Sequence, residues 1–183
     1  MQSLLSPRQT VRLAAQVELL GLTYGPGDAF TCLDVGAEFG LTGRKVGGAF
    51  PNATIDGIDI YGPTITNALE YNGQHYATLR QEDARLFLAE TEEAWDVGIA
   101  AEVIEHMDKD DGPHFLASLR ERCERVIVTT PLGYLPYGEK SGNPYDLHRC
   151  GWTQDEMEAL GFKTFAVYPQ HHIGVYYSGD LRT

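Results

Sequence analysis

Two carboxylates and an imidazole follow directly after an apolar stretch near the middle of the chain. The segment WDVGIAA (95–101) is typical of a buried strand, and AEVIEH (101–106) then brings Glu102, Glu105 and His106. If the chain turns helically there, these side chains share one face, where two carboxylates repel each other unless a positive charge lies between them. Carboxylate oxygens with an imidazole nitrogen suit a divalent cation such as Mg²⁺, Mn²⁺ or Zn²⁺. The alternative is that Glu105 and His106 simply begin a solvated loop.

The elements that must position these residues alternate between strands and helices along the chain. An amphipathic helix should begin near Pro7, and a capping box of Thr153 and Glu156 predicts a helix that ends at Leu160 before Gly161. Five strands alternating with helices predict an α/β fold, a doubly wound Rossmann-like sheet with helices on both faces. We expect it to be mostly parallel with an antiparallel terminal strand, because the last two strands, 162–168 and 173–178, can pair as an antiparallel addition at one edge. The expected strands are 29–35, 53–60, 75–80, 95–101, 125–131, 162–168 and 173–178, and the other expected helices are 41–50, 63–72 and 112–123.

Length and composition describe one acidic domain. The chain has 183 residues, is 43% hydrophobic and carries a net charge of −12, which predicts a single domain over 1–183 with a helical segment at 1–28 and a long loop at 132–150. An acidic surface repels phosphate backbones, so we expect no nucleic-acid partner. No apolar run approaches the ~20 residues of a membrane span, and no signal peptide is evident. These features predict a cytoplasmic protein with no membrane partner.

A glycine turn and two acidic residues stand where a nucleotide-like ligand would bind. Gly36 follows the first expected strand in LDVGAEFG, and Asp59 ends the second. Glycine lets a backbone approach a ligand, and an acidic residue about 20 positions later is placed to hold a ribose diol. Asp83 and Ala84 follow the third strand, where an adenine could rest. The alternatives are a strand-end cap for Asp59 and a helix N-cap for Asp83.

The motif series resembles the class I S-adenosylmethionine-dependent methyltransferases. The motifs LDVGAEFG, IDGIDIY, EDA, WDVGIAAEVIEHM and VIVTTP occur in this order between about Phe30 and Tyr168. The resemblance implies S-adenosyl-L-methionine as cofactor, with its methionine part in the turn 34–40, its ribose on Asp59 and its adenine amino group on Asp83. The cofactor-binding residues implied in this way are Asp34, Gly36, Ala37, Glu38, Gly40, Asp59, Ile60, Asp83, Ala84 and Glu102.

Glu38 departs from the family pattern. The family has glycine at the middle of G-x-G-x-G, and here that position is Glu38. Its side chain could crowd the cofactor, or its carboxylate could pair with the cofactor's ammonium group. The first possibility keeps open a non-catalytic methyltransferase-like binding module. An NAD-dependent oxidoreductase is a further alternative, but it would need the fuller G-x-G-x-x-G pattern.

The E-x-x-E-H motif is similar to that of two narrower groups, the small-RNA 3′-terminal 2′-O-methyltransferases and the ubiquinone-pathway O-methyltransferases. The former also have a histidine shortly before a W-T helix start, and His148 precedes Trp152 in this way. The resemblance implies Mg²⁺, or Mn²⁺ or Zn²⁺, as a second cofactor. The implied metal ligands are Glu102, Glu105, His106 and His148.

Such a cation would stabilise the alkoxide of an acceptor hydroxyl and orient it toward the methyl group. His106 or His148, if not a ligand, could act as the catalytic general base. Tyr134, Tyr137 and Tyr145 of the 132–150 loop could stack on a sugar or an aromatic ring. We therefore expect O-methylation of a small hydroxylated molecule or glycan, with methylation of an RNA 3′ end as the alternative.

Overall fold

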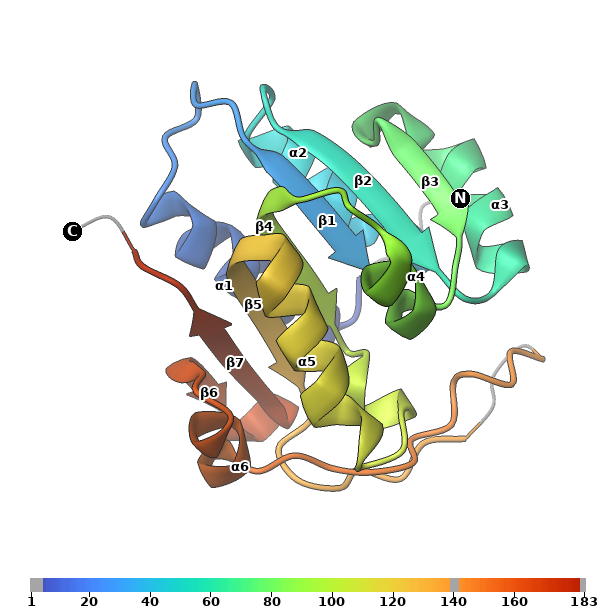
Figure 1. The fold of residues 1–183 in the computed structure, drawn as a ribbon, viewed down its shortest axis with the longest axis vertical. Coiled ribbons are helices and arrows are strands. Elements are labelled where there is room, and N and C mark those ends of the chain that lie inside the picture. The colour runs from blue at the N-terminus through green and yellow to red at the C-terminus, as the bar shows by residue number, and fades with distance from the viewer. Residues whose placement is uncertain (1–4, 139–141, 182–183) are drawn as a thin grey trace.

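Seven strands of the described residues form one sheet at the centre of the molecule (Figure 1). The structure is a computed structural model that describes residues 5–138 and 142–181. Residues 1–4 of the predicted N-terminal segment and 139–141 of the predicted loop lie outside the described residues. The strands are β1 (Thr31–Val35), β2 (Thr54–Asp59), β3 (Thr78–Gln81), β4 (Trp95–Ala101), β5 (Cys123–Thr130), β6 (Lys163–Tyr168) and β7 (Ile173–Ser178).

The strand order is β3-β2-β1-β4-β5-β7-β6, and only β7 is antiparallel to its neighbours. The predicted fold class, a mostly parallel Rossmann-like sheet, is confirmed. The two terminal strands form the predicted antiparallel addition at one edge, with β7 beside β5 and β6 outermost. Ile173, Val175 and Tyr176 of the inner strand β7 are fully buried, whereas the edge strand β6 is only half-buried.

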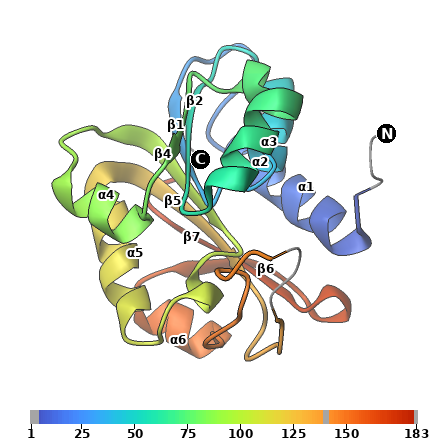
Figure 2. The same ribbon diagram turned by 90° about the vertical axis from the view of Figure 1, so that its right-hand side faces the viewer.

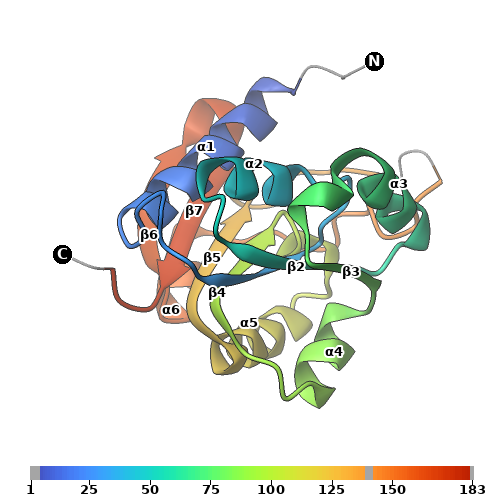
Figure 3. The same cartoon turned by 90° about the horizontal axis from the view of Figure 1, so that it is seen from above.

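Six helices cover the two faces of the sheet (Figures 2 and 3). One face carries α1, α2 and α3, and the other carries α4, α5 and α6. Each face has its own apolar core, one around Leu19, Phe50 and Ile127 and the other around Phe115 and Trp152. The helices are α1 (Pro7–Gly21), α2 (Leu41–Ala49), α3 (Gly62–Asn72), α4 (Ala84–Glu90), α5 (Asp111–Arg122) and α6 (Gln154–Ala159).

Local capping signals fix two helix starts that the sequence predicts. Ser6 and Gln9 form a capping box at the start of α1, and Pro7 occupies its first turn. Thr153 and Glu156 form the predicted capping box of α6. Among the described residues, no helix combines the length and the apolar composition that a membrane span requires.

The carboxyl ends of the five parallel strands meet at one edge of the sheet, toward which their arrowheads point in Figure 1. The chain moves outward from β1 through β2 to β3, and then returns to the other side of β1 with β4. In open α/β sheets, ligands bind beyond the strand ends at such a reversal of strand order. The turn after β1 and the EVIEH segment after β4 both lie there.

We expect opposite stability effects from alanine at two glycines of α2. A Cβ at Gly43 would lie 2.2 Å from Cζ of Tyr76, whereas a Cβ at Gly48 would have no atom within 4 Å. Gly43→Ala should therefore lower the free energy of unfolding by about 1–3 kcal/mol through overpacking. Gly48→Ala should raise it by roughly 0.5–1 kcal/mol, because alanine loses less backbone entropy in a helix. Urea unfolding followed by circular dichroism measures both, and a Gly43→Ala protein as stable as wild type would contradict this packing.

Candidate functional site

A cleft of about 610 Å³ opens at the carboxyl ends of the strands. Its walls come from the start of α1, the turns after β1, β2 and β4, the start of α4 and the 132–150 loop. Four predicted site residues, Asp34, Ala37, Gly40 and Glu105, are buried and do not line its surface. The predicted residues that line it are Gly36, Glu38, Asp59, Ile60, Asp83, Ala84, Glu102, His106 and His148.

Gly36 is required by packing inside the protein. Its φ of +72° lies in the left-handed region, and a Cβ there would lie 2.6 Å from Cγ2 of Val103. The absent side chain therefore lets the segment after β4 pack against the turn after β1. The amides of Gly36 and Ala37 donate to the carbonyl oxygen of Ile58 at 2.9 and 3.0 Å, which ties the turn to β2.

Glu38 also lies in the left-handed region, with a φ of +47°. A side chain at this φ costs about 1–2 kcal/mol, which is the physical reason a glycine is favoured at such a position. Its amide donates to Oδ2 of Asp59 at 2.9 Å, and its side chain is exposed to the cleft. The surrounding protein raises the pKa of the Glu38 carboxyl by desolvation, while Arg12 opposes that shift and Asp59 adds to it.

Asp59 connects the turns after β1 and β2. Its Oδ1 accepts from the amide of Tyr61 at 2.8 Å, and its Oδ2 accepts from the amide of Glu38. Each carboxylate oxygen has a second lone pair that remains available to a ligand hydroxyl. Ile60 continues the cleft wall beside it.

Asp83 is the N-cap of α4, as the alternative interpretation of the sequence held. Its Oδ1 accepts from the amide of Arg85 at 3.0 Å, and its Oδ2 pairs with the Arg85 guanidinium at 2.7 Å. Hydrogen bonding from Arg85 lowers the pKa of Asp83. Any ligand amino group at Asp83 would therefore share this carboxylate with Arg85.

Asp34 is fully buried beneath the turn. The hydroxyl of Tyr76 donates to its Oδ2 at 2.6 Å and accepts from the amide of Gly43 at 3.0 Å. Burial raises the pKa of Asp34 to about 7 despite this hydrogen bond. Asp34 therefore holds the start of α2 in place through Tyr76, a contact that nothing in the sequence spacing indicated.

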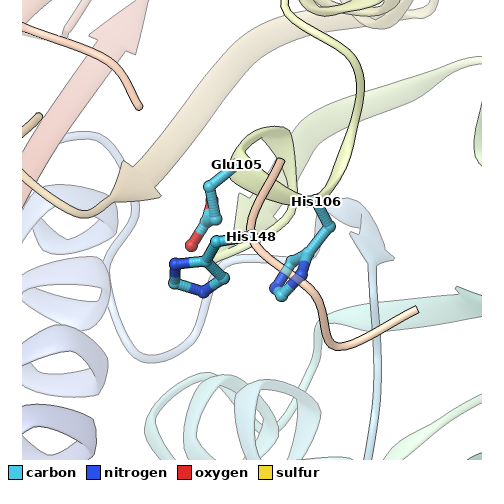
Figure 4. Close-up of side chains that lie close together, drawn as sticks. All are labelled: Glu105, His106 and His148. Carbon is cyan, nitrogen blue, oxygen red and sulfur yellow. The ribbon is translucent and has the colours of Figure 1, made fainter. Parts of the chain in front are cut away.

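Three of the four predicted metal ligands lie close together (Figure 4), and two of them, His106 and His148, line the cleft. Glu105 and His106 lie in a short 3₁₀ turn (Ile104–His106), and His148 comes from the 132–150 loop. Their potential ligand atoms all lie within 4.8 Å of one another. The rings of His106 and His148 meet edge to face, with centroids 4.8 Å apart.

Backbone hydrogen bonds hold the loop against the turn. The carbonyl oxygen of Glu105 accepts from the amides of Arg149 and Cys150 at 2.8 and 3.2 Å. The carbonyl oxygen of Ile104 accepts from the indole of Trp152 at 3.3 Å. These bonds fix the loop on both sides of the turn and bring His148 to His106.

Among the described residues, each of the two histidines uses one ring nitrogen, Nδ1, in a hydrogen bond. Nδ1 of His106 lies 3.3 Å from the carbonyl of Leu147, and Nδ1 of His148 lies 2.6 Å from that of Leu135. A carbonyl only accepts, so each Nδ1 carries the proton and each Nε2 keeps its lone pair. Burial and the neighbouring His148 lower the pKa of His106 to about 4, and burial also lowers that of His148. Both rings are thus neutral near pH 7, the form that binds metal or accepts a proton.

Glu105 is fully buried with one unsatisfied oxygen. Its Oε2 accepts from the hydroxyl of Thr130 at 3.1 Å, whereas its Oε1 has no partner among the described residues. Burial, reinforced by the charge of Glu102, raises the pKa of the Glu105 carboxyl. A buried carboxyl oxygen beside two imidazole lone pairs matches the donor set of Zn²⁺ or Mn²⁺ more closely than the oxygen-rich set of Mg²⁺.

Glu102 does not join this group. It precedes the 3₁₀ turn with a left-handed φ of +60°, so the expected helical face shared with Glu105 and His106 is wrong. Its carboxylate instead forms an ion pair with Arg8 of α1. One oxygen of Glu102 has no partner among the described residues.

Sequence reasoning missed the contribution of α1 to the cleft. Arg8, Gln9 and Arg12 line it, although they come from a helix that appeared only to cover the core. A usable signal was present, because Arg8 and Arg12 are spaced to share a helix face with buried Leu19.

Comparisons with known proteins relate this chain to methyltransferases through its fold. The sequence matches no protein-family model and no curated protein. Among solved structures, it superimposes on the N-methyltransferase NodS of Bradyrhizobium japonicum WM9, in complex with S-adenosyl-L-homocysteine, with a TM-score of 0.66 and 15% identity over 94% of this chain and 87% of that one.

Two further structures give similar values. Magnesium protoporphyrin IX methyltransferase of Synechocystis PCC 6803, with bound S-adenosyl-L-homocysteine, has a TM-score of 0.67 and 15% identity over 97% of this chain and 89% of that one. A putative O-methyltransferase of Nostoc punctiforme PCC 73102 has a TM-score of 0.65 and 19% identity over 92% of this chain and 55% of that one. The chain has the Rossmann-like fold of these methyltransferases.

We expect Asp34 to make folding stability depend on pH. Its folded pKa of about 7 lies above the ordinary value of 3.8, so the folded protein retains a proton that the unfolded chain releases between these values. The proton on Asp34 therefore contributes to the free energy of unfolding below about pH 4, and this contribution is lost as the pH rises to about 7. The loss is on the order of 4 kcal/mol at most. Asp34→Asn removes the titration and still offers Tyr76 an oxygen acceptor.

Urea unfolding of wild type and Asp34→Asn across this pH range measures the effect. The stability of Asp34→Asn relative to wild type should rise with pH, whereas Glu92→Gln, an exposed change at the opposite end of β4, should follow wild type. A constant difference between Asp34→Asn and wild type would contradict the raised pKa.

Proposed function

We propose that this protein is an S-adenosylmethionine-dependent methyltransferase that methylates an oxygen atom of its acceptor. The observation that carries the proposal is one cleft that joins the Asp59 carboxylate and the turn after β1 to the two neutral histidines. Asp59 and the turn after β1 suit the ribose and the amino-acid group of the cofactor, and the two histidines suit an acceptor hydroxyl. Fold neighbours crystallised with S-adenosyl-L-homocysteine or S-adenosyl-L-methionine support it.

The cofactor would supply an electrophilic methyl group on a sulfonium, so the chain need only position the acceptor oxygen and take up its proton. Nδ1 of His106 and Nδ1 of His148 each bond a backbone carbonyl, so each Nε2 keeps its lone pair. Burial lowers the pKa of both rings, so both are neutral near pH 7. Either ring can receive the proton of an acceptor hydroxyl.

As the alternative use of the same lone pairs, Glu105, His106 and His148 would hold a divalent cation. Two imidazole nitrogens and one carboxylate oxygen make a three-ligand set with open positions for acceptor oxygens. Such a cation would lower the pKa of a bound hydroxyl. It would also neutralise the buried carboxyl of Glu105, which otherwise favours its protonated form.

The cleft wall favours a small hydroxylated acceptor or a glycan. The ring of Tyr137 stacks on His148, with centroids 5.0 Å apart, and Tyr145, which is about half exposed, also lines the cleft. Aromatic faces of this kind bind sugar rings or aromatic rings. The net charge of −12 disfavours the alternative acceptor, an RNA 3′ end.

A non-catalytic binding module is the second candidate, because Glu38 replaces a family glycine. The binding-module interpretation requires that the Glu38 side chain block the region where the cofactor would bind. Glu38 and Asp59 line the same open cleft of about 610 Å³, which lies within the ~300–1,000 Å³ typical of ligand sites. This openness favours the enzyme.

The direct test of cofactor binding is calorimetry. Wild type and Glu92→Gln should bind S-adenosyl-L-homocysteine, whereas Asp59→Asn should bind it about tenfold or more weakly, because it loses a charged hydrogen bond to the ribose. Circular dichroism must show that Asp59→Asn is folded, since Asp59 also holds the amides of Glu38 and Tyr61. The absence of binding to wild type at millimolar ligand would overturn the proposal.

Glu38→Gly separates the two candidates. If the carboxylate leaves the cofactor region open, this variant should bind S-adenosyl-L-homocysteine within a fewfold of wild type. A gain of about a hundredfold or more would instead indicate that Glu38 obstructs the site, as in the binding module. The same titration series measures both outcomes.

Metal binding should be visible as thermal stabilisation. Zn²⁺ or Mn²⁺ at about 100 times its Kd should raise the Tm of wild type by roughly 5 °C. Glu105→Gln should show no rise, because it removes the anionic ligand and keeps an oxygen for Thr130. Glu92→Gln is the matched control. An equal rise in the Tm of all three proteins would show that the cation does not bind at Glu105.

A further inference from the structure

Arg12 is a buried arginine that lacks a partner. Only 8% of its surface is exposed, and no described residue forms a hydrogen bond or ion pair with its guanidinium. Its Nε is fully buried and unsatisfied. A charged group held in this way is costly unless an anion meets it.

The other arginines of the cleft already have carboxylate partners. Arg8 pairs with Glu102, Arg85 with Asp83 and Arg149 with Asp108. Among the described residues that line the cleft, Arg12 is thus the arginine that remains available to a ligand anion.

The surroundings of Arg12 select the kind of anion. It lines the cleft together with Gly36 and Glu38, at the end where the turn after β1 lies. The positive charge of Arg12 opposes the rise in the pKa of the Asp34 and Glu38 carboxyls. Neither carboxyl lies within ion-pair distance of the Arg12 guanidinium. A positive group with a nearby carboxyl on the cleft surface is complementary to a zwitterion, the charge pattern of an α-amino acid.

We propose that Arg12 binds the carboxylate at the amino-acid end of the S-adenosyl ligand, with Glu38 beside its ammonium group. This inference rests on the proposed function and assigns a binding residue that the motif pattern does not include. The planar guanidinium can donate two parallel hydrogen bonds to a carboxylate, which a lysine at this position could not reproduce.

A purely structural role for Arg12 predicts a different behaviour. If Arg12 held α1 against the sheet, its removal would lower the Tm. An arginine kept for a ligand has no internal partner to lose, so Arg12→Met should leave the Tm unchanged or raise it. Methionine retains the apolar stem of the side chain.

The decisive experiment compares S-adenosyl-L-methionine with its decarboxylated form, which differs only by the missing carboxylate. Wild type should bind the complete ligand at least about tenfold more tightly. Arg12→Met should bind both ligands with similar affinity, at the level of wild type with the decarboxylated form. Arg44→Met, on α2 outside the cleft, is the matched control and should behave as wild type.

Three results would overturn the inference. The first is that Arg12→Met discriminates between the two ligands as well as wild type does. The second is that Arg12→Met lowers the affinity for both ligands alike. The third is that wild type binds both ligands equally. In each case cofactor binding and the proposed function would stand. Failure of wild type to bind either ligand would remove the proposed function and this inference together.

Discussion

The site depends on the carbonyl oxygens of Ile104 and Glu105, which accept hydrogen bonds from the loop that carries His148. These bonds come from the backbone at Arg149 and Cys150 and from the indole of Trp152. Together with the bond from Nδ1 of His106 to the Leu147 carbonyl, they hold the segments of His106 and His148 side by side. The turn after β4 is in turn held by Val103, which fills the space that Gly36 leaves open. One chain of contacts therefore joins the cofactor end of the cleft to the histidine end.

Burial controls the protonation of the groups beneath the cleft. It raises the pKa of Asp34 and Glu105 and lowers the pKa of His106 and His148. The result is a set of mostly neutral groups, and neutral imidazoles keep the lone pairs that a cation would bind. An acceptor proton transferred to a neutral imidazole would then be accommodated close to the carboxyl of Glu105.

Local patterns in the sequence predicted most of the framework. The capping box at Thr153, the strand ends at Asp59 and Ala101, and the alternation of strands with helices depend on residues close together in the chain, so they were readable. The grouping of Glu105, His106 and His148 was expected from a resemblance, and the geometry agrees with it.

Features that depend on residues far apart in the sequence could not be predicted from it. Glu102 was expected among the metal ligands, but its partner is Arg8, far away in sequence on α1. The left-handed backbone of Glu38 and Glu102 follows from how the turns pack on their neighbours, not from residue type. Likewise, β7 lies between β5 and β6, so the last strand of the chain is not the outermost one, and spacing alone does not give this order.

The central claim is that one cleft holds an S-adenosyl ligand at Asp59 and presents its sulfur toward His106 and His148. A crystal structure of the protein soaked with S-adenosyl-L-homocysteine tests it most directly. The account predicts ribose hydroxyls within hydrogen-bond distance of the Asp59 carboxylate, the amino-acid end at the turn after β1, and the sulfur facing the two histidines. An S-adenosyl ligand bound elsewhere, or one whose sulfur faces away from both histidines, would contradict the account.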